Sequence, residues 1–390
     1  MFRLQLLSYF LVSQILNAQD IWTPRQNFFQ GRSFAVGFSI GDKGYLGTGD
    51  NGGFYTWDFW EYDPQTNAWT QKADFVNGRA GAIGFSIGSK GYIGMGVQNA
   101  GGGSPNDFWE YDTTLNIWSQ KADFIGVRKA NAVSFTIGNK AFVGTGNGPY
   151  GGKDFWEYDQ PTDTWTRKAD FPGIGRGDAC GFSIGLKGYL GLGQDSMYQL
   201  HNDFWEYDMV GDSWTQKTDF PGAVRMGSAG FSIAGKGYLG TGWVFPNGGH
   251  ADFWEYNPDT DSWQQRTDCY PANYAVGFTI GLKGYVATGG SNLFWEYSPD
   301  TTTGIVNSFE TPSSFEISPN PATGYFVISN LPKENPMLEI YDINGKKIYS
   351  KIMEAESMGL TLNGAGIYYA AVRNIKRNRT QIRKLIITGL

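Results

Sequence analysis

The chain has 390 residues, of which 55 are glycine and 16% are aromatic, and its formal net charge is −6. This length allows one large domain and a small one, and this composition favours many short strands joined by tight turns over a disordered chain. The charge is uneven: residues 314–390 carry ten basic and six acidic side chains, whereas residues 19–313 have a net charge of −11. The acidic main part argues against nucleic acid and anionic membrane surfaces as partners.

The first 18 residues have the pattern of a secretory signal peptide. Arg3 precedes an apolar run over residues 4–16, and small residues end at Ala18. The run is too short to span a bilayer, so we expect export through the inner membrane and no transmembrane helix. Export permits a disulfide between Cys180 and Cys269, the two cysteines of the chain. The alternative is that both are separate buried hydrophobic residues.

A repeat dominates residues 20–300. Each unit contains four β-like runs. In the first unit, the first run ends at Ile40, and the other three cover residues 44–48, 58–62 and 69–74. Residues 63–67 (Asp-Pro-Gln-Thr-Asn) indicate a tight turn between the last two runs. A period in the 40s with four short strands predicts one propeller blade per repeat. The sequence Phe-Trp-Glu-Tyr marks the third run, and it starts at Phe59, Phe108, Phe155, Phe204, Phe253 and Phe294.

The starts and ends of the repeats are offset by one. Residues 21–28 match the end of a repeat, whereas the unit that starts at Phe294 has no repeat-end tryptophan after it. We therefore predict that the N-terminal strand near Trp22 pairs with the third strand of the last blade near Trp295. A ring closed in this way leaves no free sheet edge between its two ends.

These repeats resemble kelch repeats over roughly residues 20–300. The matching features are the arginine at the start of each unit, the run of Tyr45 and Leu46 into glycine, and the spacing of Tyr62 from Trp69. The kelch diglycine departs from the pattern, since adjacent glycines stand there only in the sixth unit, at Gly289 and Gly290. The resemblance implies an all-β fold over residues 19–300: a six-bladed kelch-like β-propeller closed by an N-terminal strand.

After Asp300 the repeat stops. Residues 301–314 are rich in Thr and Ser and indicate a linker. Alternating apolar residues around Asn344-Gly345 then predict a small C-terminal β-sandwich over residues 315–390. This part resembles the type A C-terminal sorting domain of type IX secretion, on the strength of residues 318–322, 338–346, 364–368 and 383–387. The resemblance implies the type IX machinery as a partner and a location outside the cell or on the outer-membrane surface.

Two sets of residues are candidates for ligand binding. The repeated arginines stand between the fourth strand of one blade and the first strand of the next. They could bind an anionic ligand such as a carboxylate-bearing sugar. The alternative is that they hold neighbouring blades together. The loops between the second and third strands vary in length and carry aromatic residues, which suit carbohydrate or protein surfaces. We predict that a ligand binds on the face formed by these loops and the four-to-one loops. The candidates are Arg32, Arg79, Arg128, Arg176, Arg225, Tyr55, Trp57, Tyr150, Tyr198 and Trp243.

No catalytic residue, cofactor or metal is predicted. A glutamate (Glu61 and its counterparts) and a lysine (Lys43 and its counterparts) recur in all six units, so we expect them to be structural and to lie close together. The two histidines, His201 and His250, stand in loops without further metal ligands at a suitable spacing.

These observations favour an exported binding module that recognises a glycan or a protein at or beyond the cell surface. Two alternatives stay open. The kelch resemblance includes carbohydrate-active enzymes such as a sialic acid mutarotase, for which the arginines and an acid such as Asp178 or Asp195 would be needed. A copper oxidase of the same fold fits poorly, because two histidines do not supply its ligand set. The other alternative is a purely structural surface or adhesion protein.

Overall fold

The computed structural model of the chain describes residues 20–99, 103–146, 152–246 and 248–299, and then separate segments between residues 316 and 387. Throughout these residues the regular elements are strands, as the repeats predict. A helix that could cross a membrane is not found among them. The predicted signal peptide (residues 1–18), the predicted linker (301–314) and Tyr150 lie outside the described residues.

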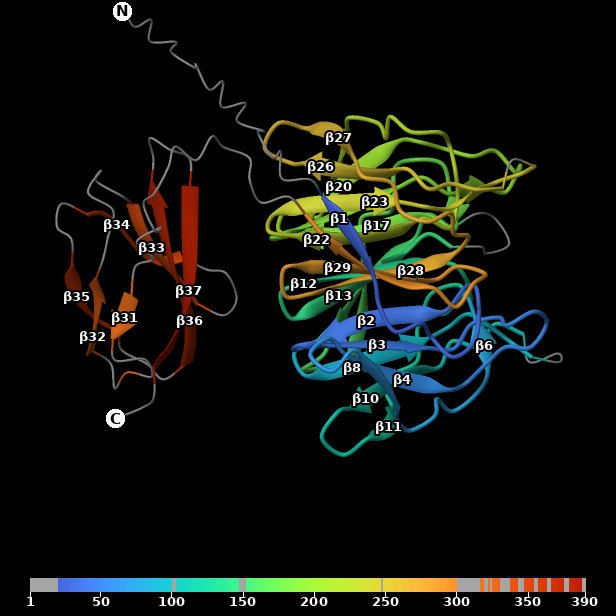
Figure 1. The fold of residues 1–390 in the computed structure, drawn as a ribbon, viewed down its shortest axis with the longest axis horizontal. Coiled ribbons are helices and arrows are strands. Elements are labelled where there is room, and N and C mark those ends of the chain that lie inside the picture. The colour runs from blue at the N-terminus through green and yellow to red at the C-terminus, as the bar shows by residue number, and fades with distance from the viewer. Residues whose placement is uncertain are drawn as a thin grey trace, which may run out of the picture.

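Six four-stranded antiparallel sheets form the propeller (Figure 1). The first blade consists of β2 (Val36–Ile40), β3 (Lys43–Gly47), β4 (Phe59–Asp63) and β5 (Ala68–Gln71). The next four blades repeat this order of strands from the inside outward. Their strands are β7 (Ile83–Ile87), β8 (Lys90–Gly94), β10 (Phe108–Asp112) and β11 (Ile117–Gln120); β12 (Val133–Ile137), β13 (Lys140–Gly144), β14 (Phe155–Asp159) and β15 (Thr164–Lys168); β17 (Cys180–Ile184), β18 (Lys187–Gly191), β20 (Phe204–Asp208) and β21 (Ser213–Lys217); and β22 (Ala229–Ile233), β23 (Lys236–Gly240), β26 (Phe253–Asn257) and β27 (Ser262–Arg266).

The two ends of the repeat region share the sixth blade. Its strands β28 (Ala275–Ile280), β29 (Lys283–Thr288) and β30 (Phe294–Ser298) come from the end of that region, and β1 (Ile21–Pro24) pairs with β30 as the outer strand. Trp22 stands opposite Tyr297, and Pro24 stands opposite Trp295. The predicted closure is confirmed. It removes the open edge that β30 would otherwise expose to other strands.

Rings packed between the sheets join each blade to the next. Phe59 stacks on Tyr45 of its own blade with ring centroids 5.6 Å apart, and it contacts Tyr111 and Trp118 of the second blade at 4.9 and 5.0 Å. The indole N–H of each repeat-end tryptophan also reaches the neighbouring blade. Trp118 donates to the Ala73 carbonyl at 2.9 Å, for example, and Trp22 donates to the Thr267 carbonyl at 2.9 Å. Aromatic pairs of this geometry stabilise beyond their buried area, which explains the aromatic content of the repeat.

The predicted turn between the third and fourth strands is present, and it also links blades. Asn67 adopts a positive φ of 54°, which Asn tolerates better than most residues. Its Oδ1 accepts hydrogen bonds from the Tyr62 hydroxyl at 2.8 Å and from the backbone N–H of Gln26 at 2.9 Å. A turn residue of the first blade therefore holds the chain that precedes it, and Asn116, Asp163, Asp212 and Asp261 repeat this arrangement.

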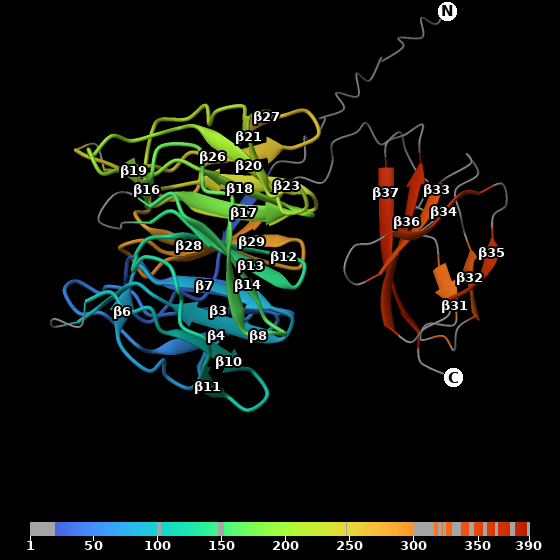
Figure 2. The same cartoon turned by 180° about the vertical axis from the view of Figure 1, so that it is seen from behind.

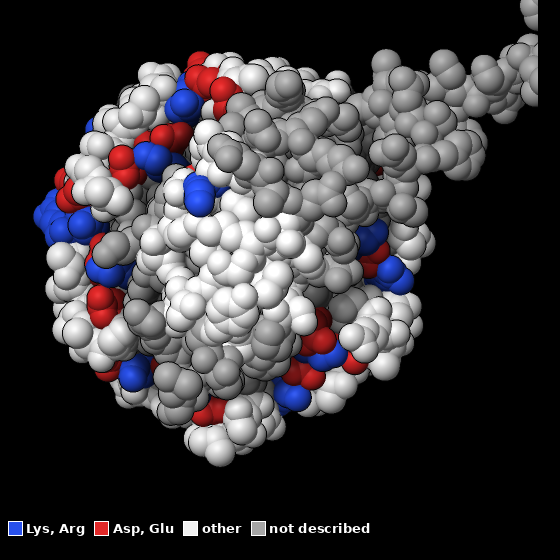
Figure 3. All heavy atoms as spheres, turned by 90° about the vertical axis from the view of Figure 1, so that its left-hand side faces the viewer, with Lys and Arg blue, Asp and Glu red and all other residues white. Residues whose placement is uncertain are grey.

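The repeated lysines contact the predicted glutamate in the third, fourth and sixth blades, and they contact the aspartate that ends the third strand in the first four blades. Lys187 lies 2.9 Å from Asp208 and 3.7 Å from Glu206, whereas Lys43 pairs with Asp63 at 3.0 Å. The reason is register: in the third and fourth blades the lysine stands opposite the aspartate, whereas the glutamate stands opposite an aromatic residue of the second strand, Phe142 or Tyr189. Figure 3 shows basic and acidic side chains lying beside one another around the visible rim of the disc.

The C-terminal part is a small β-sandwich of two sheets (Figure 2). One sheet contains β31 (Glu316–Ser318), β32 (Tyr325–Ser329) and β35 (Met358–Thr361). The other contains β33 (Met337–Asp342), β34 (Lys347–Ile352), β36 (Gly366–Asn374) and β37 (Arg379–Ile387). Phe326, Ile328, Leu338 and Ile340 are fully buried in one cluster between them. The predicted all-β fold of this part is therefore confirmed.

Candidate functional site

Two sets of loops lie on one face of the propeller, which we call the loop face. The four-to-one and two-to-three loops meet there through short strand pairs: β6 (Arg79–Ala80) with β9 (Val97–Gln98), and β16 (Arg176–Gly177) with β19 (Gln194–Asp195). A third pair joins β24 (Trp243–Val244) to β25 (Gly248–Gly249) within one loop. Figures 1 and 2 show β6, β16 and β19 on the same side of the disc. The variable loops thus gather where the sequence places them.

Four of the five candidate arginines are buried in ion pairs, so their predicted ligand-binding role is not supported. Arg32, Arg79, Arg176 and Arg225 are at most 2% exposed. The Nη atoms of Arg79 lie 2.7 and 2.8 Å from the two carboxylate oxygens of Asp107, and Nη1 also donates to the Met95 carbonyl at 3.0 Å. Its guanidinium carbon lies 4.6 Å from the centre of the Phe75 ring. The same arrangement pairs Arg32 with Asp58, Arg176 with Asp203 and Arg225 with Asp252.

The remaining two blades show that the pair is a structural unit. In the third blade Arg128 is exposed, and Lys129 takes the buried place, with its Nζ 2.7 Å from Asp154 and 5.4 Å from the centre of the Phe124 ring. The sixth unit lacks both the arginine and the aspartate. There the Tyr270 hydroxyl donates to the Thr288 carbonyl at 3.0 Å, a bond that matches the one from Arg79 to Met95. The basic residue and its aspartate are thus either both present or both absent in a blade, as expected if the pair holds neighbouring blades together.

The electrostatics of these pairs agree with a structural role. Burial alone would raise the pKa of the Asp107 carboxyl, but the hydrogen bonds and charge of Arg79 and the indole N–H of Trp109 outweigh burial and lower it. The pKa values of Asp58, Asp203 and Asp252 are lowered by the same opposition of causes. These four aspartates therefore stay charged and hold their arginines.

The aromatic candidates do not form one site. Tyr55 and Trp57 lie on the first blade, Tyr198 on the fourth and Trp243 on the fifth. Successive blades pack side by side around the ring, so the first and fourth blades are on opposite sides of the axis. Tyr198 is 80% exposed, and Trp243 is partly buried with its ring 6.0 Å from that of Phe245. Of the four that the structure describes, only Tyr55 and Trp57 share a cleft.

Two clefts of the loop face meet at Trp57. The first, of about 380 Å³, lies over the first blade, and the second, of about 360 Å³, lies between the first and second blades; Trp57 and Asn99 line both. We call them cleft A and cleft B. The other residues of cleft A are Gln30, Asn51, Phe54, Tyr55, Thr56, Asp58, Gln71 and Asp74. The other residues of cleft B are Val76, Asn77, Gly78 and Gln98.

Trp57 stands at a repeat position that asparagine occupies in three other units. The residue two places before the Phe is Asn106 in the second unit, Asn202 in the fourth and Asn292 in the sixth. The side-chain amides of Asn106 and Asn202 donate to backbone carbonyls of the four-to-one loop at 3.3 Å. Trp57 has no side-chain amide for this bond, and the residue is 55% exposed although its side chain is large and mostly apolar. The third and fifth units have Lys153 and Ala251 at this position, so the repeat tolerates other residues there.

The backbone on both sides of Trp57 is held firmly. The Asn99 side chain accepts a hydrogen bond from the Tyr55 N–H at 2.9 Å and donates to the Tyr55 carbonyl at 2.8 Å. The Trp57 carbonyl accepts from the Phe75 N–H at 2.7 Å. A Cβ on Gly78 would lie 2.2 Å from the Tyr55 carbonyl oxygen, so only glycine permits this close approach. Sequence reasoning identified Trp57 and Tyr55 but missed Gln30, Asn77 and Asn99, because their contribution depends on contacts between blades.

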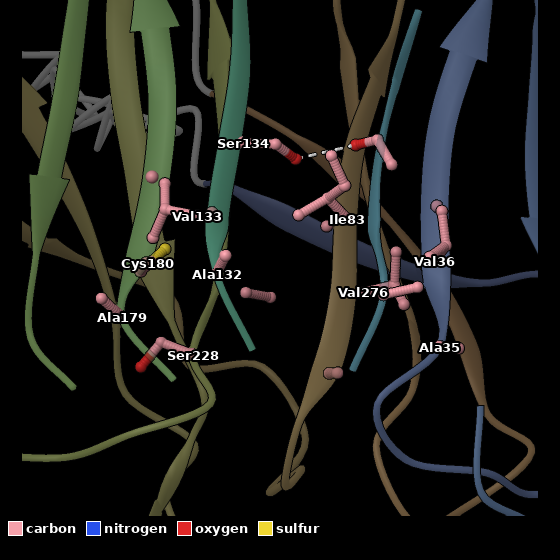
Figure 4. Close-up of a pocket in the computed structure, with 18 residues that line it drawn as sticks. Ala35, Val36, Ile83, Ala132, Val133, Ser134, Ala179, Cys180, Ser228 and Val276 are labelled. Atoms are coloured by element: carbon pink, nitrogen blue, oxygen red, sulfur yellow. Dashed lines mark hydrogen bonds between the residues drawn. The ribbon is translucent and has the colours of Figure 1, made fainter. Parts of the chain in front are cut away.

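The axis of the propeller holds a narrow channel of about 160 Å³ (Figure 4). Residues 35–37 and their counterparts in the other inner strands line it, and they are mostly Ala, Val and Gly. The Ser134 hydroxyl, which Figure 4 shows beside this channel, donates to the Gly84 carbonyl at 3.1 Å. Burial raises the pKa of the Cys180 thiol to about 12, so it is not a nucleophile at neutral pH. Both Cys180 and Cys269 are free, and the disulfide alternative is wrong.

The histidines and the acids of the enzyme alternative serve the loops. His201 Nε2 lies 2.9 Å from Asp195 Oδ2, and Asp195 also accepts from the N–H groups of Met197 and Gln199. Asp178 belongs to a belt of backbone hydrogen bonds around the axis, since its N–H donates to the Asn131 carbonyl at 3.1 Å. Burial and the charge of Arg225 lower the pKa of His250. Among the residues that the structure describes, no group of three or more His, Cys, Asp or Glu is arranged to hold a metal.

Comparisons with known proteins agree with both parts of the chain. Residues 316–388 match the family described as the secretion system C-terminal sorting domain. A solved structure titled "Structure of YjhT" has a TM-score of 0.62 to this chain at 16% sequence identity, covering 71% of this chain and 98% of that one. At this identity the likeness shows the fold alone. No curated protein matches the sequence. The chain therefore has a β-propeller fold followed by a type IX sorting domain, which implies export and contact with the secretion machinery.

Proposed function

We propose that the propeller is an exported binding module that recognises carbohydrate through the clefts at Trp57. The observation that carries this proposal is the exposed ring of Trp57 between two clefts, at a repeat position where asparagine stands in three other units. Aromatic rings with amide side chains beside them offer both an apolar surface and hydrogen bonds, which is the combination that a sugar ring with its hydroxyls needs. The sorting domain supports this function, because it directs the propeller to where extracellular glycans are met.

The alternative of a sialic-acid-type enzyme loses its main support. It depended on the repeated arginines, and four of them are buried against aspartates. A purely structural role does not account for the preformed clefts or for the exposure of Trp57.

A glycan array with the purified full chain tests the proposal. The expected result is binding that Trp57→Ala weakens at least tenfold, since an anchoring aromatic residue contributes more than about 1.4 kcal/mol. Tyr198→Ala is the matched control, because Tyr198 is an exposed loop aromatic on the opposite blade and its loss should leave binding unchanged. Binding that survives Trp57→Ala but is lost in Tyr198→Ala would place the site on the fourth blade and contradict the proposed position at Trp57. A chain that binds no glycan at all would reject the function.

A further inference from the structure

We propose that clefts A and B are consecutive subsites for one neutral, linear glycan that crosses Trp57 from the first blade to the second. This inference rests on the proposed function and names its ligand class. Trp57 and Asn99 line both clefts, so a chain leaving one cleft passes the Trp57 ring before it enters the other. Each cleft lies near the lower end of the range for small-molecule sites, and together they suit an extended ligand better than a single compact one.

The charges around the clefts select against an anionic ligand. No lysine or arginine lines either cleft among the described residues. The two acids of cleft A are Asp58, which Arg32 already holds at 2.7 Å, and Asp74, which accepts a hydrogen bond from the Gln71 side chain at 2.9 Å. A uronate or sialate would lose water at this site and gain no cation in return, which is unfavourable. A neutral sugar meets no such penalty.

The polar groups that do line the clefts are mainly amides. Cleft A presents Gln30, Asn51 and Gln71, and cleft B presents Asn77 and Gln98. Each carboxamide offers both donors and an acceptor, and so it can pair with a sugar hydroxyl in either sense. The apolar surface comes from Trp57 and, in cleft A, also from Phe54, which is 76% exposed. Phe54 follows a turn that the Asp50 carboxylate fixes by accepting from the Gly52 and Gly53 N–H groups.

The wall between the subsites is preorganised. Asn99 of the second blade fixes the backbone of Tyr55, and Phe75 fixes that of Trp57, so both ends of this three-residue segment are anchored. Binding therefore orders little of the protein, and rigidity of this kind reduces the entropic cost of association. Because the hydrogen bonds of Asn99 join two blades, the relative position of clefts A and B is set by the scaffold and not by the ligand.

The test measures affinity against chain length and charge. Cello-, xylo-, manno- and chito-oligosaccharides of one to six units are titrated into the full chain by calorimetry, with oligogalacturonates of the same lengths as the anionic counterpart. For the series that binds, we expect the affinity to rise at least tenfold from one unit to four and then to level off, and the oligogalacturonates to bind at least tenfold more weakly.

Three variants separate the subsites. Phe54→Ala should weaken binding through cleft A, Asn77→Ala should weaken binding of the longer oligomers several-fold while sparing the monosaccharide, and Trp57→Ala should weaken both. Phe54 and Asn77 are exposed, so these variants should keep the urea unfolding midpoint of the wild type. Trp57-dependent binding without any gain in affinity beyond one unit, or tighter binding of the galacturonates, would overturn this inference but leave the proposed function standing. Absence of binding to every oligosaccharide would overturn both.

Discussion

Replacing Arg79 with alanine distinguishes an arginine that holds blades together from one that binds a ligand. The Arg79 side chain is fully buried, and alanine removes its two hydrogen bonds to Asp107, its bond to the Met95 carbonyl and its contact with the Phe75 ring. The Asp107 carboxylate then keeps only the bond from the Trp109 indole at 2.9 Å among its side-chain partners. The variant therefore contains a partly buried charge without its counter-ion.

The expected loss of unfolding free energy follows from this geometry. Removing one member of a buried ion pair costs about 3–5 kcal/mol. Because the Asp107 side chain remains 18% exposed, water can partly solvate it, and we expect a value near the lower end, about 3 kcal/mol. The pKa of Asp107 should also return upward, since burial would no longer be opposed by Arg79.

Tryptophan fluorescence during urea unfolding of the full chain is a suitable assay. All 14 tryptophans stand between residues 22 and 295, so the signal reports on the propeller and not on the sorting domain. Arg128→Ala is the matched control, because Arg128 precedes the buried Lys129 in the third blade and is itself exposed; its loss should change stability by no more than about 0.5 kcal/mol. An Arg79→Ala protein that unfolds at the same urea concentration as the wild type would refute the structural interpretation.

Three further predictions follow from the contacts of the structure. Lys129→Arg should raise the unfolding free energy by about 1 kcal/mol, because a guanidinium can bind Asp154 through two parallel bonds as in the other blades; a lower urea midpoint would contradict this. Stability should fall most steeply as the pH drops below about 4, since the lowered pKa values of Asp58, Asp107, Asp203 and Asp252 contribute stability above their unfolded value of 3.8 that is lost as these groups are protonated; a midpoint that stays constant down to pH 3 would exclude this cause. Deleting residues 315–390 should leave the propeller in the periplasm of the native host, measured by fractionation and immunoblotting, and normal release of the truncated protein would argue against the predicted sorting role.

The sequence alone determined the architecture, because the residues that make each contact within a blade recur at the same spacing in six units. The offset between repeat starts and ends was enough to place Trp22 beside β30, and the alternation within Phe-Trp-Glu-Tyr was enough to place rings on both faces of each sheet. The turns between the third and fourth strands could also be predicted from the sequence, since Asp and Asn stand where the backbone turns and adopts a positive φ. Each of these features depends on residues close together in the chain or on the period itself.

The function of individual side chains was decided only by the tertiary structure. The sequence shows that the arginines recur, but burial between blades decides that Arg79 faces Asp107, 28 residues away, and not a ligand. Lys129 and Tyr270 take over contacts that an arginine makes in other blades, and the sequence pattern does not predict these replacements. The clefts at Trp57 arise because Asn99 of one blade reaches Tyr55 of another, 44 residues earlier. Contacts between different repeats depend on how the blades pack around the axis, and that packing is set by the whole ring of aromatic residues, which no single stretch of sequence specifies.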